Sequence, residues 1–148
     1  MAIIKNKKAF HNYEVLNRFE AGISLVGTEV KSLREGKVKI IEAFCRITND
    51  AELILQGLEI AQYSHGNINN HQPTRDRKLL MHKQEIIRLS NQMAEKGLSL
   101  IPLGMYFKRG KVKVEIALCR GKKMHDKREA MKKKDAKREI DRALKESR

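Results

Sequence analysis

Residues 98–119 have the sequence LSLIPLGMYFKRGKVKVEIALC, and this stretch decides the fold class. Its second half alternates between two faces, one with Val112, Val114, Ile116 and Leu118 and the other with Lys111, Lys113 and Glu115. This period of two predicts an antiparallel strand with one face in a core and the other in solvent. The Arg109-Gly110 pair separates it from an apolar run, so we expect a partner strand over residues 98–107.

Shorter strand-like segments precede this pair. Alternation of side-chain character begins at Tyr13. Residues 44–48 and 52–55 flank Asn49-Asp50, a pair that is typical of hairpin turns. Residues 58–61 extend or follow this hairpin. The chain is therefore expected to contain many short strands.

Two segments have the helical period instead. A short helix is expected over residues 27–37, because Thr28 can cap its start and Gly36 can end it. A longer helix is expected over residues 82–96, which a glycine follows. The apolar residues that we place on the inner side of the longer helix are Ile86, Ile87, Leu89 and Met93.

These elements predict a fold that is mainly β with added α: an OB-type antiparallel β-barrel with two or three helices. Among small barrels, the OB type is the one most associated with nucleic acids. We expect residues 1–119 to form this body, with a basic irregular arm over residues 1–12 and a long polar loop over residues 63–78. Residues 120–148 form a separate basic tail.

The tail, RGKKMHDKREAMKKKDAKREIDRALKESR, has thirteen Lys and Arg residues and six Asp and Glu residues. Its net charge of +7 is half of the +14 that all 148 residues carry. It lacks the apolar residues to build a core of its own, and Ala136, Ile140, Ala143 and Leu144 fall at helical spacing. The tail is either a solvated extension without a specific role or an arm that becomes helical on RNA.

The strong positive charge favours nucleic acid over other partners, because both the body and the tail are basic. A membrane is the weaker interpretation, since no apolar run approaches the roughly 20 residues that a spanning helix needs. The first ten residues lack the apolar stretch of a secretory signal. Cys45 and Cys119 have no metal-like spacing, and we expect buried thiols in a reduced, cytoplasmic protein.

Two short segments offer groups that suit RNA. NKKAFHNY, residues 6–13, combines lysines for phosphates with His11 and Tyr13, which can stack on bases; a strand edge with solvated lysines is the alternative. PTRDRKLL, residues 73–80, ends the polar loop, and arginine forks fit phosphate geometry. The cations that we assign to RNA in this second segment are Arg75, Arg77 and Lys78.

Catalysis has little support in the sequence. The histidines have neither the spacing of a zinc site nor the company of a nucleophile motif, so we expect no catalytic residue, metal or cofactor. A small nuclease that uses His65, His71 and Asp76 is the alternative from another class. Glu20 and Glu29 stand out in a basic body, either as structural ion-pair partners or as acceptors for RNA hydroxyl and amino groups.

Four segments together resemble the SmpB family, the SsrA-binding proteins of bacteria. They follow in the family's order: NKKAFHNY (6–13), FEAGISLVGTEVKSLREGK (19–37), PTRDRKLL (73–80) and GKKMHDKR (121–128). The resemblance implies an OB-type adaptor that binds the tRNA-like domain of transfer-messenger RNA and brings it to stalled ribosomes. It also implies that the tail is disordered in solution and helical on the ribosome, where it probes the empty messenger channel and the small-subunit decoding centre.

Family roles carry over to matching residues of this chain. RNA binding falls on Asn6, Lys7, Lys8, His11, Tyr13, Glu20, Leu80 and Lys113. Contact with the decoding centre falls on Gly121, Lys122, Lys123, His125, Asp126, Lys127 and Arg128. We expect a monomer with transfer-messenger RNA and the ribosome as partners. An OB-type ribosomal RNA-binding or assembly factor is the alternative function.

Overall fold

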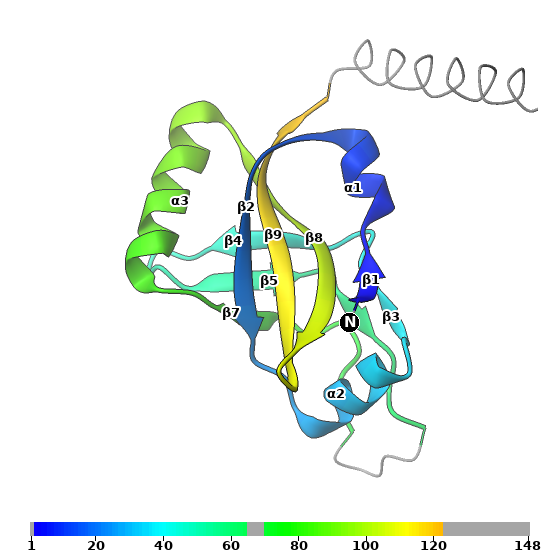
Figure 1. Ribbon diagram of the computed structural model, residues 1–148. Helices are drawn as coiled ribbons and strands as arrows, with labels where there is room; N and C mark the ends of the chain where they lie inside the picture. The colour runs from blue at the N-terminus through cyan, green and yellow to red at the C-terminus, as the bar shows by residue number, and fades with distance from the viewer. Residues whose placement is uncertain (1, 65–69, 123–148) are drawn as a thin grey trace, which may run out of the picture.

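The computed structural model describes residues 2–64 and 70–122, in which three long strands, six short strands and three helices are present (Figure 1). The strands are β1 (Ala2–Lys5), β2 (Tyr13–Ile23), β3 (Val38–Lys39), β4 (Phe44–Ile47), β5 (Leu53–Gln56), β6 (Glu59–Ile60), β7 (Arg77–Leu80), β8 (Ser99–Lys108) and β9 (Lys111–Gly121). The helices are α1 (Lys7–Asn12), α2 (Gly27–Arg34) and α3 (Lys83–Lys96).

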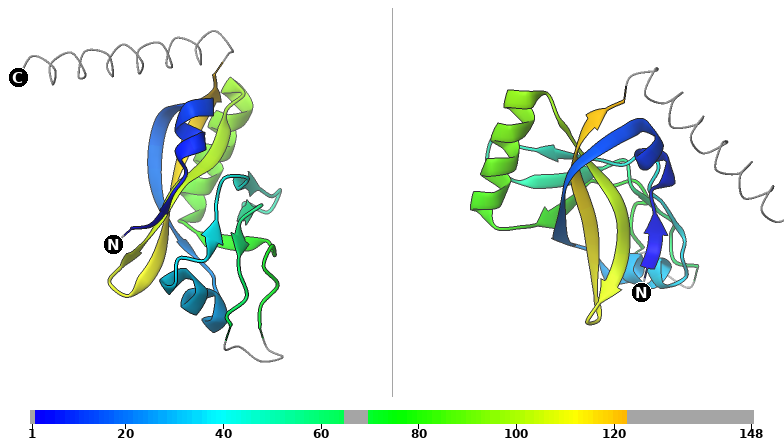
Figure 2. Two further views of the ribbon diagram at one scale, coloured as in Figure 1. Left: turned by 90° about the vertical axis from the view of Figure 1, so that its right-hand side faces the viewer. Right: turned by 45° about the horizontal axis from the view of Figure 1, so that its top comes forward.

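Six strands pair in a closed circuit, which is the arrangement of a small barrel. The order is β8, β4, β5, β7, β2, β9 and back to β8, and each of these pairs is antiparallel. The long strands β2, β9 and β8 cross the short strands β4, β5 and β7 (Figure 2). The prediction of a mainly β fold with an antiparallel sheet and added helices is confirmed.

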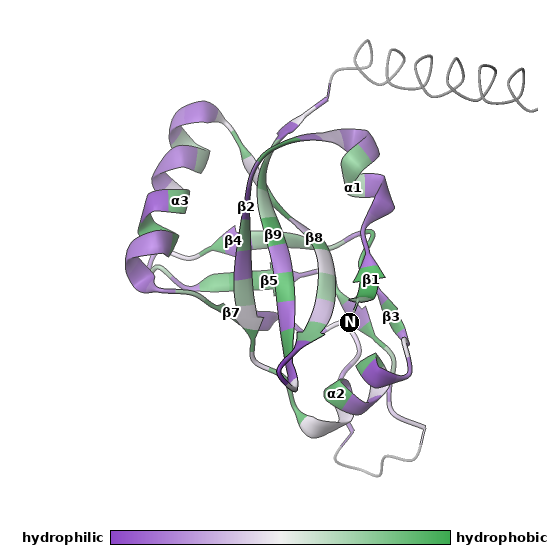
Figure 3. Ribbon diagram, in the orientation of Figure 1, coloured by the Kyte–Doolittle hydropathy of each residue, from purple (hydrophilic) through white to green (hydrophobic). Residues whose placement is uncertain are grey.

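The alternation in β9 is confirmed, and Figure 3 shows part of it as bands of opposite hydropathy. Its apolar face lies in the main core, where Val114 and Ile116 are fully buried. The opposite face changes along the strand. Near the turn it carries Lys113, whereas Ala117 and Cys119 are buried in a second small cluster with Ala9 of α1. Helix α1 therefore covers one end of the barrel's outer surface.

The prediction of an irregular arm over residues 1–12 is wrong. Strand β1 pairs with β8, and α1 follows it directly. Asn6 starts this helix: its Oδ1 accepts from the Ala9 N–H at 3.1 Å, and its Nδ2 donates to the Pro102 carbonyl at 3.0 Å. Asn6 is only 1% exposed, so its side chain is a buried structural cap. Its assignment to RNA binding is corrected accordingly.

Both predicted helices are present, with two differences. Residue Val26, and not Thr28, precedes α2, and the Glu29 carboxylate accepts from the Val26 N–H at 2.9 Å. On α3, Ile86 and Leu89 are buried, but Ile87 is 44% exposed. One residue corresponds to a 100° rotation about a helix, which moves Ile87 off the buried stripe. The glycine stop is confirmed, since Gly97 adopts a left-handed conformation with φ of 62°.

Both cysteines are buried free thiols, as predicted. Burial raises the pKa of Cys119 to about 11 and that of Cys45 still further. Because the thiolate is the reactive form of cysteine, these side chains are inert members of the core at neutral pH.

Strand β6 does not extend β5, although the two are separated by only two residues. At Gly57 the chain turns with φ of +77°, and β6 then pairs with β3 in a separate two-stranded sheet. A Cβ atom on Gly57 would lie 2.5 Å from the carbonyl oxygen of Glu42. The segment that precedes β4 and the connection between β5 and β6 thus approach so closely here that only glycine fits.

Replacing Gly57 with Ala should lower the free energy of unfolding by about 1–3 kcal/mol, because it adds a clash to a strained conformation. Chemical denaturation measures the change. Gly36→Ala is the matched control: φ at Gly36 is +72°, but a Cβ there meets nothing within 4 Å. Equal losses in the two variants would show that φ alone, and not the approach of Glu42, makes Gly57 necessary.

Candidate nucleic-acid interface

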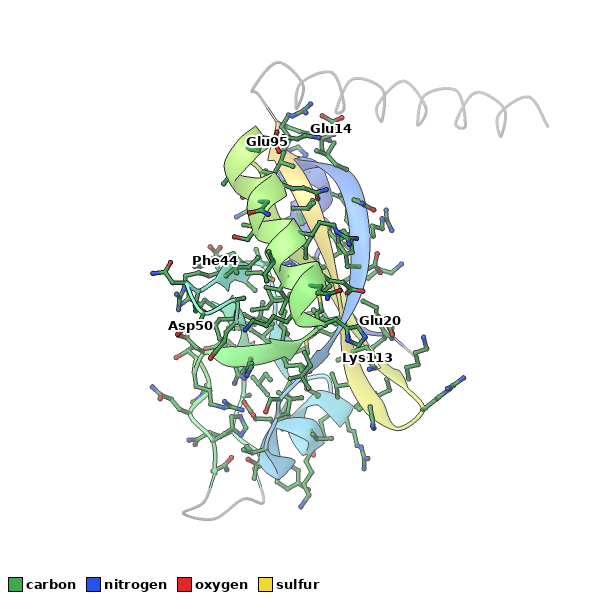
Figure 4. All side chains as sticks on the ribbon, turned by 90° about the vertical axis from the view of Figure 1, so that its left-hand side faces the viewer. Glu14, Glu20, Phe44, Asp50, Glu95 and Lys113 are labelled. Carbon is green, nitrogen blue, oxygen red and sulfur yellow. The ribbon has the colours of Figure 1, made fainter. Side chains whose placement is uncertain are left out.

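Three predicted RNA-binding residues meet on one face of the barrel, although they lie far apart in the sequence. Glu20 of β2, Leu80 of β7 and Lys113 of β9 line a shallow depression of about 470 Å³ beside the start of α3. Figure 4 shows Glu20 and Lys113 together below that helix. The side chain of Leu80 is 53% exposed. It has room because the neighbouring strand carries Gly22, whose Cβ would lie 3.2 Å from that of Leu80.

We call Glu20, Leu80 and Lys113 the barrel-face cluster. It brings together three kinds of group that can contact RNA. The ammonium group of Lys113 suits a phosphate, the apolar surface of Leu80 suits a sugar or base, and the Glu20 carboxylate accepts from a 2′-hydroxyl or a base amino group. A face of this kind recognises shape and chemistry together, which a purely cationic surface does not.

The Glu20 carboxylate is held in place by strand β8. The hydroxyl of Tyr106 donates to Glu20 Oε2, and Nζ of Lys108 lies 3.3 Å from the same oxygen. The Tyr106 hydrogen bond is the largest effect on the pKa of Glu20 and lowers it; desolvation opposes this, and Lys108 and Lys113 lower the pKa further. Burial and the bond to Glu20 raise the pKa of Tyr106 to about 12. The phenol therefore keeps its proton, and Glu20 keeps its charge, at neutral pH.

Replacing Tyr106 with Phe should raise the pKa of Glu20 toward its ordinary value, because the main hydrogen bond to the ionised form is lost. A carboxyl-carbon NMR titration measures it. Lys108→Met should also raise this pKa, because both the hydrogen bond and the charge of the lysine lower it. An unchanged pKa in Tyr106→Phe would show that Tyr106 does not hold the carboxylate.

A second group of predicted residues lies on and after helix α1, at the end of the barrel where β9 finishes (Figure 1). Lys7, Lys8 and His11 have exposed side chains, and Tyr13 is partly exposed. Nζ of Lys8 lies 3.8 Å from a carboxylate oxygen of Glu42. The structure thus separates the predicted contacts into this α1 group and the barrel-face cluster.

The assignment of Arg77 to RNA binding is wrong, because its side chain is completely buried. Its Nε donates to Glu29 Oε2 at 2.6 Å. Its Nη1 donates to the carbonyls of Leu58 at 2.7 Å and Arg75 at 3.0 Å, and its Nη2 donates to the carbonyl of Pro73 at 2.9 Å. No phosphate can reach a fork that is already used in this way.

Arg75 donates from Nε to Glu29 Oε2 at 3.1 Å, and its side chain is 32% exposed. Burial raises the pKa of the Glu29 carboxyl, but the hydrogen bonds from Arg75, the Val26 N–H and Arg77 outweigh it and hold the pKa below its ordinary value. Of the two roles considered for Glu29, the structure supports the ion pair. The third cation of this segment, Lys78, is exposed and shares the outer face of β7 with Leu80.

The nuclease alternative depends on His65, His71 and Asp76. Of its two histidines, the structure describes His71, which has a structural role. His71 is 5% exposed; its Nδ1 lies 2.9 Å from Oγ1 of Thr28 and its Nε2 2.8 Å from the Ile60 carbonyl. His65 lies outside the described residues. Asp76 accepts from the Gln56 side chain at 3.1 Å. Residues 2–64 and 70–122 contain no group of three or more His, Cys, Asp and Glu side chains that could hold a metal ion.

The first residues of the tail are tied to the body. Gly121 pairs with Tyr13, so β9 continues two residues beyond the predicted end of the body. The Lys122 N–H then donates to the Asn12 carbonyl at 2.9 Å, and Nζ of Lys122 to that of Phe10 at 3.2 Å. The other predicted decoding-centre residues, from Lys123 to Arg128, lie outside the described residues. A helix that could cross a bilayer does not occur in the described part of the chain.

Comparison with known proteins decides the family. The family model described as "SmpB protein" matches residues 3–146. The chain belongs to the SmpB family. The SsrA-binding protein of Syntrophobacter fumaroxidans is 54% identical over 99% of this chain and 90% of its own length. The SsrA-binding protein of Pelotomaculum thermopropionicum is 53% identical over 97% of this chain and 94% of its own length. The resemblance that the four sequence segments indicated is confirmed.

A solved structure shares the SmpB fold with this chain. It is described as "tmRNA-SmpB: a journey to the center of the bacterial ribosome" and is 48% identical in sequence. The TM-score is 0.68, and the similarity covers 86% of this chain and 93% of that one. The architecture described above is therefore that of an SmpB-family protein seen with transfer-messenger RNA.

Two features of this SmpB-family surface were missed in the sequence. Tyr106 could have been found, because the turn at Arg109-Gly110 sets the register that places it opposite Lys113. The second feature is the guanidinium of Arg18, which stacks 5.6 Å from the centre of the Phe10 ring. No local pattern indicates that contact, since it joins an exposed helix residue to an exposed strand residue.

Proposed function

We propose that this chain is an RNA-binding adaptor. It binds the tRNA-like domain of transfer-messenger RNA and delivers it to stalled ribosomes for trans-translation. The observation that carries the proposal is the match to the SmpB family over residues 3–146, together with relatives named SsrA-binding proteins. SmpB is a family of RNA-binding proteins, and we assign this member a non-catalytic role in the cytoplasm.

The barrel-face cluster supports the first half of the proposal, because it offers a preformed surface with a cation, an apolar contact and a fixed carboxylate. The tail supports the second half. In this proposal residues 123–148 follow the anchored Lys122 into the empty messenger channel, and residues 121–128 contact the decoding centre. A message still in the channel would exclude the tail by volume, and its phosphates would compete for the lysines.

Sequencing the RNA that co-purifies with the full chain tests the proposed partner. One dominant small RNA, transfer-messenger RNA, is expected. Bulk ribosomal RNA without that species would instead favour the alternative of a ribosomal RNA-binding or assembly factor. Incubation with labelled RNA and divalent metal ions should give no cleavage, and cleavage would restore the nuclease alternative.

Replacing Lys113 with Ala should weaken binding of the tRNA-like RNA and lower the slope of log affinity against log salt by about 1, because one phosphate contact is lost. Filter binding between low and moderate salt measures both quantities. Lys96→Ala, at the exposed end of α3, is the matched control and should change neither. An unchanged slope in the Lys113 variant would remove this residue from the phosphate contacts.

A further inference from the structure

A second hollow in the surface lies between helix α1, the start of β4 and the start of β8. Its volume is about 420 Å³, which falls within the range of roughly 300–1,000 Å³ typical of small-molecule sites and leaves space for one nucleotide. We call it the α1–β4 groove. Buried Cys45 and Leu100 belong to its lining, as do the more exposed Tyr13, Ile41 and Phe44.

Two large apolar side chains of this groove are exposed to solvent. Phe44 is 46% exposed and Ile41 is 56% exposed. The orientation of Phe44 follows from the strand: the next residue, Cys45, points into the core, so Phe44 must point outward. Exposed apolar side chains that gather in one hollow of a charged surface are a feature of interaction sites.

One cation lines the groove, and a second lies on the strand that carries Phe44. Lys8 of α1 belongs to its lining, and Arg46 shares the outer face of β4 with Phe44. Both side chains are exposed, and Nε of Arg46 donates a hydrogen bond to Oε1 of Gln56 at 3.2 Å. The groove thus joins an exposed aromatic ring, on which an unpaired base can stack, to Lys8, whose ammonium group lies 3.8 Å from Glu42 and can also meet a phosphate.

The groove is distinct from the barrel-face cluster and is close to the root of the tail. Figure 4 shows Phe44 on one side of α3 and Glu20 and Lys113 on the other. Asn12 and Tyr13 line the groove, and the same two residues hold the tail root, through the bond from the Lys122 N–H to the Asn12 carbonyl and the pairing of Tyr13 with Gly121. A partner that binds the first residues of the tail would therefore also lie close to the groove.

We propose that the α1–β4 groove captures one unpaired nucleotide of ribosomal RNA from the small subunit, with its base stacked on Phe44 and its phosphate on Lys8 or Arg46. This inference rests on the proposed function, which takes the tail to the decoding centre while the barrel-face cluster holds the tRNA-like RNA. An adaptor between two RNAs needs a face for each, and the groove supplies the second.

The test measures binding of the full chain to vacant small ribosomal subunits and, separately, to the tRNA-like RNA. Phe44→Ala should weaken subunit binding by roughly 5- to 150-fold, the loss of one stacked base, and leave tRNA-like RNA binding unchanged. Ile87→Ala is the matched control, because Ile87 is 44% exposed and does not line the groove. The chain contains no Trp, so Phe44→Trp adds a single fluorophore that subunits should quench.

Phe44→Leu distinguishes a base from a protein partner, because leucine keeps an apolar contact but has no aromatic face. It should bind subunits as weakly as Phe44→Ala; binding as tight as that of the unaltered chain would assign the groove to a ribosomal protein and overturn the inference. Loss of tRNA-like RNA binding in Phe44→Ala would overturn it too. If Phe44→Ala changes neither affinity while Lys113→Ala weakens RNA binding, the inference fails and the proposed function stands.

Discussion

Replacing Arg77 with Met should lower the free energy of unfolding by about 3–5 kcal/mol, the typical loss when one partner of a buried ion pair is removed. The change leaves the fully buried Glu29 carboxylate without its 2.6 Å bond. It also removes the Arg77 donor from the Leu58 carbonyl, whereas the Pro73 carbonyl keeps its bond from the Ile60 N–H. Urea denaturation followed by circular dichroism measures the loss.

Lys78→Met is the matched control, since Lys78 is the next residue along β7 and is exposed. Its effect on unfolding should be small, because surface substitutions usually stay within about 0.5 kcal/mol. A stable Arg77→Met variant that nevertheless loses RNA affinity would contradict the structural role and return Arg77 to the RNA contacts.

A double-mutant cycle with Glu29→Gln isolates the pair, for which coupling of about 0.5–3 kcal/mol is expected. The pH dependence of the free energy of unfolding tests the same ion pair independently. Because the pKa of Glu29 is depressed in the folded state, its contribution is fully present above the ordinary carboxyl pKa of 4.5. It is lost as the pH falls through the lower, folded-state value. The stability gap between the unaltered chain and Arg77→Met should therefore narrow in acid.

A chain that ends after Lys122 should keep its affinity for the tRNA-like RNA and lose tagging on stalled ribosomes completely. The reason is that, in the proposed function, the barrel face binds the tRNA-like RNA and the tail enters the messenger channel. The structure places the cut after Lys122 because Gly121 pairs with Tyr13 and the Lys122 N–H donates to the Asn12 carbonyl. Filter binding and an in vitro tagging assay measure the two activities.

A cut after Cys119 is the informative comparison. It removes the last residues of β9 and exposes backbone groups of Asn12 and Tyr13, so it should also lower stability. If truncation after Lys122 reduced RNA affinity as strongly as tagging, the division of labour between body and tail would be refuted.

Local pattern explains why the final hairpin was predictable. The alternation from Lys111 to Leu118 and the turn at Arg109-Gly110 are contained within about ten residues, and one face of the strand follows from the period alone. The same holds for α3, whose stop at Gly97 requires a left-handed residue. Ile87 was wrongly placed on the buried side of α3, because its apolar character was considered without the 100° rotation that separates it from Ile86.

The failures at Asn6 and Arg77 have a different cause. Asn6 caps α1 and also bonds to Pro102, 96 positions away. Arg77 pairs with Glu29, 48 positions away. A polar side chain is buried only when distant segments supply its partners, and nothing local reports them. Both residues were therefore taken for surface groups.

By itself, the sequence determined the strand-rich character of the chain, the basic charge of body and tail, and membership of the SmpB family, because periodicity, composition and motif order are local or additive properties. Only the tertiary structure decided which polar residues face solvent. It brought Glu20, Leu80 and Lys113 to one depression and took Arg77 into the core. The physical reason is the closed circuit of strands, which places residues from β2, β7 and β9 side by side through pairings that no single segment encodes.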